Sequence, residues 1–165
     1  MATKEEFIEA ANRIWKDHGI YLWAGNGEYT EKTTIGTMRK QEQSKTDLAR
    51  VLKHIAECYE KGCDMTNSRL VDCSGLIIAI LRDLNIIKPT DDYRARDLQA
   101  KCKKVALEKL QPADLVFNKE TGATHVGIYV GDDFVIHAKG RAYGVVKRKL
   151  DTDNWVTGGR LPYFK

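Results

Sequence analysis

The chain has 165 residues, with 27 basic and 23 acidic side chains and a formal net charge of +4. Its length suits one domain, and its 42% hydrophobic and 30% charged residues exclude a collagen, a coiled coil and a disordered chain. The densest basic cluster, at residues 147–149, is only three residues long, so we expect no nucleic-acid partner.

No apolar run approaches the roughly 20 residues that span a bilayer, so we expect no membrane partner. The amino terminus carries acidic residues and lacks the apolar segment of a secretory signal, which predicts a chain made in the cytoplasm. The four cysteines form no Cys-x-x-Cys pair and are too few for a disulfide scaffold. We expect at most one of them to be chemically active, and no cofactor.

Hydrophobic spacing predicts four helices in the first two thirds of the chain. A helix is expected over residues 4–17, and a second over 47–60 with Thr46 or Asp47 as its cap. A third, apolar nearly all round and therefore buried, starts near residue 73. A short fourth helix is expected to open with Thr90 and to reach Cys102, whereas the polar segment 28–45 is predicted to be a loop.

After Pro112 the pattern becomes that of β-structure. The expected strands are 115–117, 124–130, 134–138, 144–149 and 155–161, with a hairpin turn at residues 131–133. Helices followed by an antiparallel sheet indicate an α+β fold, here a single domain spanning residues 1–165.

The segment around Cys73 carries the clearest chemical signal. It places a cysteine in the first turn of the buried helix, where free backbone N–H groups and the helix dipole favour a thiolate. Such a position can lower the pKa of a thiol, so we predict a lowered pKa for Cys73. Gly75 removes a side chain beside the sulfur, and we expect this space to admit a substrate backbone. Cys58, Cys63 and Cys102 are interpreted as structural.

A thiolate nucleophile needs a base, and the base needs an orienting partner. His18 and His54 are interpreted as surface or structural, whereas His125 and His137 lie in consecutive strands. A three-residue turn at 131–133 would pair Val130 with Phe134 and Gly127 with His137, which places both rings on one face of the sheet. Val126, Ile128 and Val130 would then point together to the other face, which we expect to be buried. A two-residue turn would place the two rings on opposite faces.

We therefore predict Cys73 as nucleophile, His125 as general base and His137 as the orienting third residue. The backbone N–H of Cys73 and the hydroxyl of Tyr21 are candidate donors to the oxyanion. A zinc site made of Cys73, His125 and His137 is the alternative that these residue types leave open.

Four segments together resemble the NlpC family of papain-like cell-wall cysteine peptidases: YLWAG at 21–25, DCSGL at 72–76, LQPADLVF at 110–117 and THVGIYVGDDFVIHA at 124–138. The resemblance implies a papain-like fold and hydrolysis of stem peptides in bacterial peptidoglycan, usually between the γ-carboxyl of D-glutamate and a diamino acid. By motif position, Cys73, His125 and His137 match the catalytic set. Tyr21 matches an active-site tyrosine, and Asp72 and Ser74 match residues that shape the substrate subsite.

The sequence departs from this family at three places. About forty residues, over roughly 28–69, are inserted between the aromatic segment and the cysteine, and this helical insertion is expected to wall the cleft. Ala24 and Ala113 stand where glycines are common. We expect local changes in backbone geometry there, without loss of chemistry.

Several functions remain open at this point. The leading one is a peptidoglycan endopeptidase without metal or cofactor, acting on the cell wall as a phage lysin, a tail-associated hydrolase or a protein secreted by a non-classical route. The alternatives are an amidase that cuts between muramic acid and L-alanine, an inactive binding or phage-tail module, and a lipid acyltransferase. Oligomeric state is not predicted.

Overall fold

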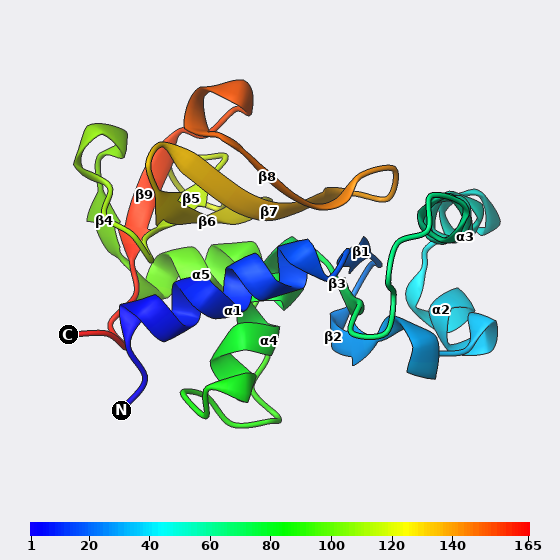
Figure 1. The fold of residues 1–165 in the computed structure, drawn as a ribbon. Helices are drawn as coiled ribbons and strands as arrows, with labels where there is room; N and C mark the ends of the chain where they lie inside the picture. Colours follow the sequence, from blue (N-terminus) through cyan, green and yellow to red (C-terminus); the bar gives the residue numbers. More distant parts are fainter.

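A computed structural model describes all of residues 1–165 (Figure 1). An antiparallel sheet lies over a layer of helices, and a smaller helical lobe projects from one end of the molecule. The predicted α+β class, with amino-terminal helices packed on a carboxy-terminal sheet, is confirmed. None of the helices combines the length and the apolar character needed to cross a bilayer.

Helix α1 (Lys4–Lys16) begins with a reciprocal cap between Thr3 and Glu6 and buries Phe7, Ala11 and Ile14. Helix α4 (Cys73–Asp83) is buried almost throughout, as its apolar sequence predicts. Together with the inner face of the sheet, these two helices form the main hydrophobic core. Cys73, the predicted nucleophile, therefore lies at the amino terminus of a helix that is buried almost throughout.

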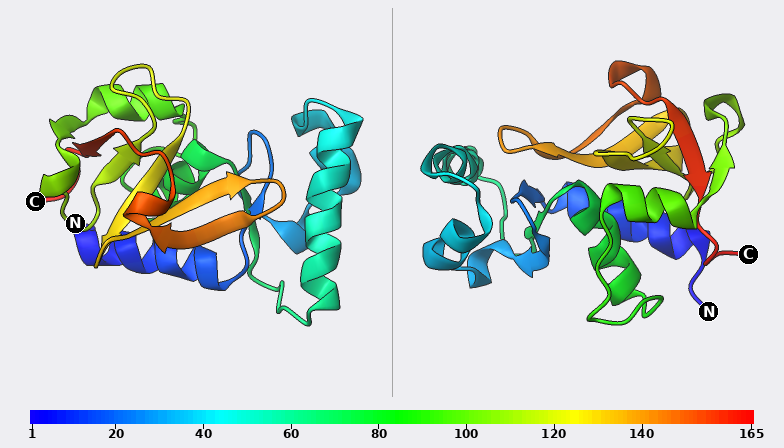
Figure 2. Two further views of the ribbon diagram at one scale, coloured as in Figure 1. Left: turned by 90° about the horizontal axis from the view of Figure 1, so that it is seen from above. Right: turned by 180° about the vertical axis from the view of Figure 1, so that it is seen from behind.

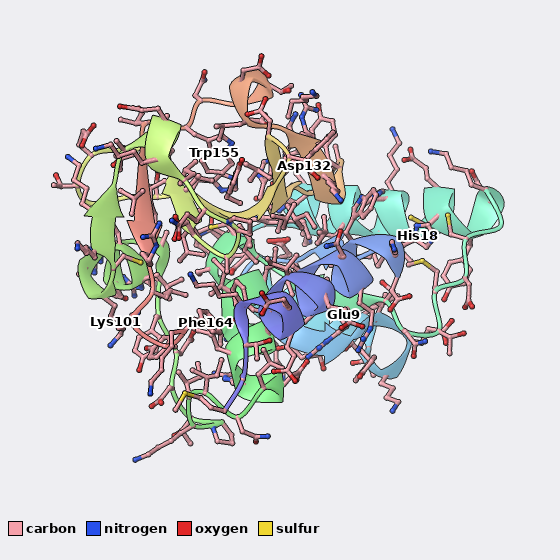
Figure 3. All side chains as sticks on the ribbon, turned by 60° about the vertical axis from the view of Figure 1, so that its left-hand side comes forward. Glu9, His18, Lys101, Asp132, Trp155 and Phe164 are labelled. Atoms are coloured by element: carbon pink, nitrogen blue, oxygen red, sulfur yellow. The ribbon has the colours of Figure 1, made fainter.

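The large sheet has six strands in the order β4-β9-β5-β6-β7-β8, and every neighbouring pair is antiparallel. The strands are β4 (Lys103–Val105), β5 (Leu115–Phe117), β6 (Val126–Gly131), β7 (Phe134–Gly140), β8 (Gly144–Lys149) and β9 (Thr157–Arg160). The inner face packs on the helices, and the outer face carries a small separate cluster around Trp155. Figure 3 shows Trp155 on the side of the sheet away from α1.

The register between β6 and β7 differs from the prediction near the turn. In the body of the hairpin Ile128 pairs with Ile136, as predicted. Closer to the turn the register shifts, and Gly131 pairs with Phe134. Val130 is therefore an extra residue in β6, a β-bulge, and the predicted pairing of Val130 with Phe134 is wrong.

The turn has two residues rather than the predicted three. Asp132 and Asp133 both adopt positive φ, at 50° and 67°, which is the requirement of a type I′ hairpin. A two-residue turn alone would send His125 and His137 to opposite faces. The bulge adds one residue to β6 and reverses that effect, so both rings remain on the outer face.

The segment predicted to be a loop is structured. It contains the end of β2 (Asn26–Tyr29), the one-turn helix η1 (Thr30–Lys32) and helix α2 (Ile35–Gln41). Helix α3 (Lys45–Glu60) follows, and its cap is Ser44 rather than Thr46 or Asp47. Figure 2 shows α2 and α3 standing together beyond the end of the sheet. They share a small core of their own with residues of β1 (Ile20–Tyr21) and β3 (Arg69–Val71).

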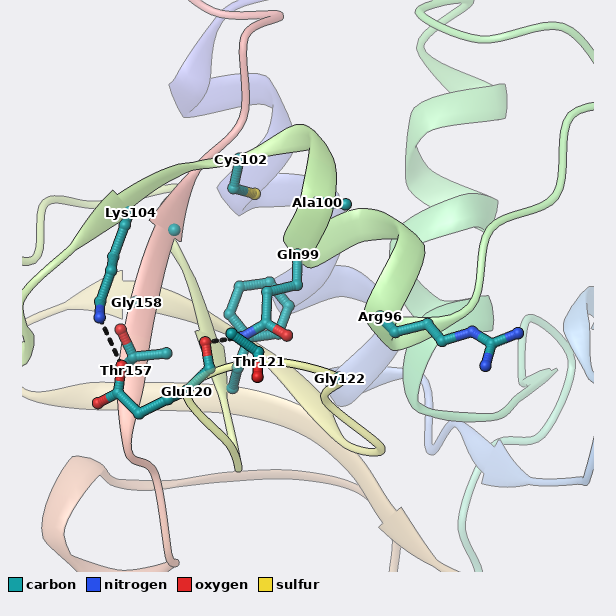
Figure 4. Close-up of a pocket in the computed structure, with 12 residues that line it drawn as sticks. Arg96, Gln99, Ala100, Cys102, Lys104, Glu120, Thr121, Gly122, Thr157 and Gly158 are labelled. Carbon is teal, nitrogen blue, oxygen red and sulfur yellow. Dashed lines mark hydrogen bonds and ion pairs between the residues drawn. The ribbon is translucent and has the colours of Figure 1, made fainter.

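The fourth predicted helix is shorter than expected. Helix α5 (Ala95–Lys101) begins after Arg94, whose backbone N–H donates to Asp97, so the predicted start at Thr90 is wrong. A cavity of about 250 Å³ lies between α5 and the strands β4 and β9 (Figure 4). Cys102 lines it, and burial with the charge of Asp114 raises the pKa of that thiol to about 12. No histidine lines this cavity, so Cys102 has no imidazole base beside it there.

Candidate active site

The fold brings Cys73 to the segment that carries His125, directly before strand β6. Cys73 is the first residue of α4, and its thiol, which is partly exposed, donates to the carbonyl of Thr124 at 3.8 Å. Thr124 directly precedes His125, at the point where the chain enters β6. The sulfur thus lies beside the segment that carries the predicted base.

The thiol of Cys73 does not have the lowered pKa that the helix position predicts. Burial and the negative charge of Asp72 raise it to about 11, although backbone N–H groups, including those of Val126 and Ser74, act in the opposite direction. Desolvation of the sulfur outweighs the free N–H groups of the helix terminus. The resting thiol is therefore neutral, and it becomes a nucleophile only when a base removes its proton.

The two predicted histidines form a direct pair. His125 Nε2 and His137 Nδ1 are 2.8 Å apart, with the ring planes nearly perpendicular. Burial and the neighbouring His137 lower the pKa of His125 to about 4, so the imidazole is neutral at pH 7. Because its Nε2 is engaged with His137, Nδ1 is the nitrogen of His125 that remains for the thiol.

Two neighbours of this pair were missed in the sequence. Asp153 lies after the one-turn helix η3 (Leu150–Thr152), and its carboxylate is 3.1 Å from His137 Nε2. The indole of Trp155 stacks on His125, with centroids 5.3 Å apart, and meets the edge of His137 at 5.0 Å. The only sequence signal for either residue was a charged and aromatic segment directly before the last strand.

Tyr21 reaches the site in spite of the insertion. Strand β1 pairs with β3 in parallel, with Tyr21 opposite Val71. The strands before and after the insertion therefore lie side by side. Burial and the nearby Cys73 raise the pKa of Tyr21, which keeps its hydroxyl protonated and able to donate. The guanidinium of Arg141 lies over the Tyr21 ring, 5.4 Å from its centroid.

Arg141 links Tyr21 to the insertion. It donates two hydrogen bonds, of 2.8 and 2.7 Å, to the carboxylate of Glu42, whose side chain is 1% exposed. Glu42 ends α2 and Arg141 lies at the tip of the β7–β8 hairpin. This ion pair joins the insertion to the hairpin beside Tyr21.

Asp72 and Ser74 lie beside Cys73, where their hydrogen bonds hold the backbone. The Asp72 carboxylate caps α4 by accepting from the N–H of Gly75 at 2.7 Å, and it also accepts from the N–H of Ala24 at 3.0 Å. The hydroxyl of Ser74 donates to the same carboxylate at 3.3 Å. Burial raises the pKa of Asp72 above its usual value.

The predicted opening beside Gly75 is filled by protein. A Cβ added there would lie 1.8 Å from the carbonyl oxygen of Gly25, so this glycine serves the close packing of α4 on the turn after β1. The expectation that a substrate backbone enters beside Gly75 is therefore wrong.

A cavity of about 230 Å³ adjoins the histidine pair. Of the seven residues that line it, only Trp155 is hydrophobic, and the others are Asn118, His125, His137, Lys139, Asp153 and Asn154. No group of three or more His, Cys, Asp or Glu side chains is placed so that it could hold a metal ion. The arrangement provides a neutral thiol, a neutral imidazole base and a chain of hydrogen bonds behind that base.

Comparison with known proteins identifies the family. The model of the NlpC/P60 family matches residues 58–158, more than half of the chain. The chain belongs to the NlpC/P60 family. Probable endopeptidases of Mycobacterium tuberculosis and Mycobacterium bovis are 35% identical to it over 83 residues, which is 50% of this chain and 20% of each relative. The match thus spans about a fifth of the length of these curated relatives.

Solved structures share the fold at low sequence identity. The P60 domain of an antigen from Mycobacterium avium subspecies paratuberculosis has a TM-score of 0.60 at 18% identity, covering 98% of both chains. NlpC2 from Trichomonas vaginalis has a TM-score of 0.59 at 19% identity, covering 97% of this chain and 47% of that one. RipD from Mycobacterium tuberculosis, described as a non-catalytic domain adapted to peptidoglycan binding, has a TM-score of 0.56 at 18% identity, covering 93% of this chain and 96% of its own.

Proposed function

We propose that this NlpC/P60 protein is a peptidoglycan hydrolase, a cysteine endopeptidase that cleaves stem peptides at the bond between γ-D-glutamate and a diamino acid. The observation that carries the proposal is the series of contacts that runs from Cys73 to His137. The Cys73 thiol lies against the segment bearing His125, and His125 is hydrogen-bonded to His137. A module that only binds peptidoglycan would need neither the thiol nor the neutral imidazole pair.

The proposed reaction follows from the protonation states. His125 takes the thiol proton on Nδ1 as the sulfur of Cys73 attacks the γ-carbonyl carbon. The backbone N–H of Cys73 and the hydroxyl of Tyr21 donate to the oxyanion. His125 then gives its proton to the leaving amine and a thioester remains on the sulfur. A water molecule, deprotonated by His125, hydrolyses the thioester and restores the thiol.

The raised pKa of Cys73 and the lowered pKa of His125 favour a general-base mechanism over a preformed ion pair. Separating charge between these groups at rest is unfavourable, because both charged forms are disfavoured by burial. Proton transfer and attack on the carbonyl are therefore expected to occur together. This proposal predicts a strong dependence of the rate on His125.

The test is digestion of purified sacculi of known stem chemistry, followed by mass spectrometry of the released fragments. We expect a new amino terminus on the diamino acid, and no release by Cys73→Ala. A matched control, Cys63→Ala, is expected to retain full activity, because Cys63 lies in the segment after α3 and away from the histidines. Release of intact stem peptides that begin with L-alanine would instead indicate the amidase, and binding without release would indicate a wall-binding module.

The proposed substrate places the site of action at the bacterial cell wall. We therefore also propose that the protein meets its substrate outside the cytoplasm. Fractionation of producing cells or of phage particles, with activity measured on sacculi in each fraction, tests this. Activity confined to the cytoplasmic fraction would contradict it.

A further inference from the structure

Asp153 stands behind the histidine pair and touches neither the sulfur nor the expected position of the substrate. Its carboxylate Oδ2 lies 3.1 Å from His137 Nε2 and 3.2 Å from Arg148 Nε, and its Oδ1 lies 3.7 Å from Lys139 Nζ. Its side chain is 19% exposed and that of His137 is 2% exposed. The carboxylate is thus placed among two cations and one imidazole, contributed by strands β7 and β8.

The positions of the protons on His137 and His125 follow from the hydrogen-bonding capacity of Asp153. Its two oxygens face the cations Lys139 and Arg148, and a carboxylate can only accept hydrogen bonds. His137 must therefore carry its proton on Nε2. In a neutral imidazole the other nitrogen is then bare, so His137 Nδ1 accepts a hydrogen bond.

The same reasoning extends to the second ring. The donor to His137 Nδ1 is the Nε2–H of His125, at 2.8 Å. His125 is neutral at pH 7, so its Nδ1 carries a lone pair. This is the nitrogen left for the thiol. The opposite direction of all these hydrogen bonds would put a proton on His125 Nδ1, and no base would face the sulfur.

We propose that Asp153 is a positioning residue that sets the tautomers of both His137 and His125, and so leaves a lone pair on the nitrogen of His125 that serves Cys73. The importance of Asp153 for catalysis rests on the proposed function, whereas the assignment of the protons on the two histidines does not. Trp155, packed against both rings, holds the planes in which these hydrogen bonds are aligned.

The groups that face Asp153 explain why the carboxylate is needed. Lys139 and Arg148 both point at it, and without it their positive charges would face the imidazole of His137 unopposed. His137 would then be free to carry its proton on Nδ1. That proton would be donated to His125 Nε2 and would leave His125 protonated on Nδ1.

The first test is the tautomeric state, read from the nitrogen chemical shifts and long-range couplings of 15N-labelled histidines at pH 7. In the wild-type protein we expect both His125 and His137 to carry their protons on Nε2. A proton on Nδ1 of either ring in the wild-type protein would overturn the proposal. This measurement needs no variant and no activity, so it stands even if sacculi are not cleaved.

The second test compares Asp153→Ala with Asp151→Ala, the same change at an exposed aspartate two residues earlier. In Asp153→Ala we expect mixed tautomers, and on sacculi a kcat lowered about 10- to 100-fold with little change in KM. Asp151→Ala should resemble the wild type, and Asp153→Glu should recover part of the rate. Wild-type tautomers and wild-type kcat in a folded Asp153→Ala would overturn the proposal.

Discussion

Gly75→Ala tests the close approach between α4 and the turn that follows β1. An added Cβ would lie 1.8 Å from the carbonyl oxygen of Gly25 and 2.8 Å from Oδ1 of Asp72. The first atom is backbone and accepts a hydrogen bond from the N–H of Asp72 at 3.0 Å, so relief requires a shift of the turn. Overpacking of this kind costs about 1–3 kcal/mol, and loss of the hydrogen bond about 1 kcal/mol more.

The helix propensity of alanine offsets up to about 1 kcal/mol of this cost. We therefore expect Gly75→Ala to lower the free energy of unfolding by about 2 kcal/mol, and the Tm by about 4–8 °C for a chain of this length. The free energy of unfolding is measured by urea denaturation monitored by circular dichroism. The matched control is Gly36→Ala in α2, where the nearest atom to an added Cβ is Thr34 Oγ1 at 3.7 Å, and the change should be neutral or stabilising. Equal stability of Gly75→Ala and wild type would refute the reasoning.

Three further changes test other parts of the account. Ala24 has a φ of 60°, which strains the backbone of any residue with a Cβ. Ala24→Gly should therefore raise the free energy of unfolding by about 0.5–1 kcal/mol, measured by urea denaturation. A lower free energy of unfolding would show that Ala24 is not strained. Glu42→Gln leaves Arg141 without its buried carboxylate and should lower the free energy of unfolding by about 2–3 kcal/mol in the same urea experiment. An unchanged free energy of unfolding would show that the ion pair does not stabilise the fold. Because burial lowers the pKa of His125 to about 4, the unfolded chain binds more protons than the folded one between about pH 6.5 and 4. Stability should therefore fall by up to about 3 kcal/mol as the pH drops through that window, and an unchanged slope in His125→Ala would contradict the assignment.

Patterns that depend on local chemistry were predictable from the sequence. The apolar spacing predicted both α1 and α4, and the nearly continuous apolar sequence of α4 predicted its burial. Asp72 caps α4 where the predicted start of that helix lies. Alternation along β6 placed Val126 and Ile128 in the core. These features depend on residues close together in the chain, so periodicity is enough to find them.

Features that depend on distant partners were not predictable. Helix α2 has a single buried residue, Met38, and its stability comes from packing against α3 and β1, so the segment resembles a loop in sequence. The two-residue turn at Asp132 and its compensating bulge leave the same alternation as a three-residue turn. Asp153 meets His137 only because β8 and η3 return the chain to the same face of the sheet.

The raised pKa of Cys73 has a similar origin. The position of a thiol at a helix terminus is visible in the sequence, but its desolvation depends on how the 124–126 segment and the turn after β1 close around it. Burial changes the pKa of Cys73 more than the helix dipole does, and the extent of burial could not be predicted from the sequence pattern.

The central claim is that Cys73 forms a thioester with the acyl part of a stem peptide, and acid-quenched intact-mass analysis tests it most directly. Protein mixed with L-alanyl-γ-D-glutamyl-diamino acid peptide should gain the mass of the L-alanyl-γ-D-glutamyl group, on a fragment that contains Cys73 and in a form that hydroxylamine removes. Cys73→Ala should show neither adduct nor hydrolysis. Cleavage of the peptide that persists in Cys73→Ala would contradict the account.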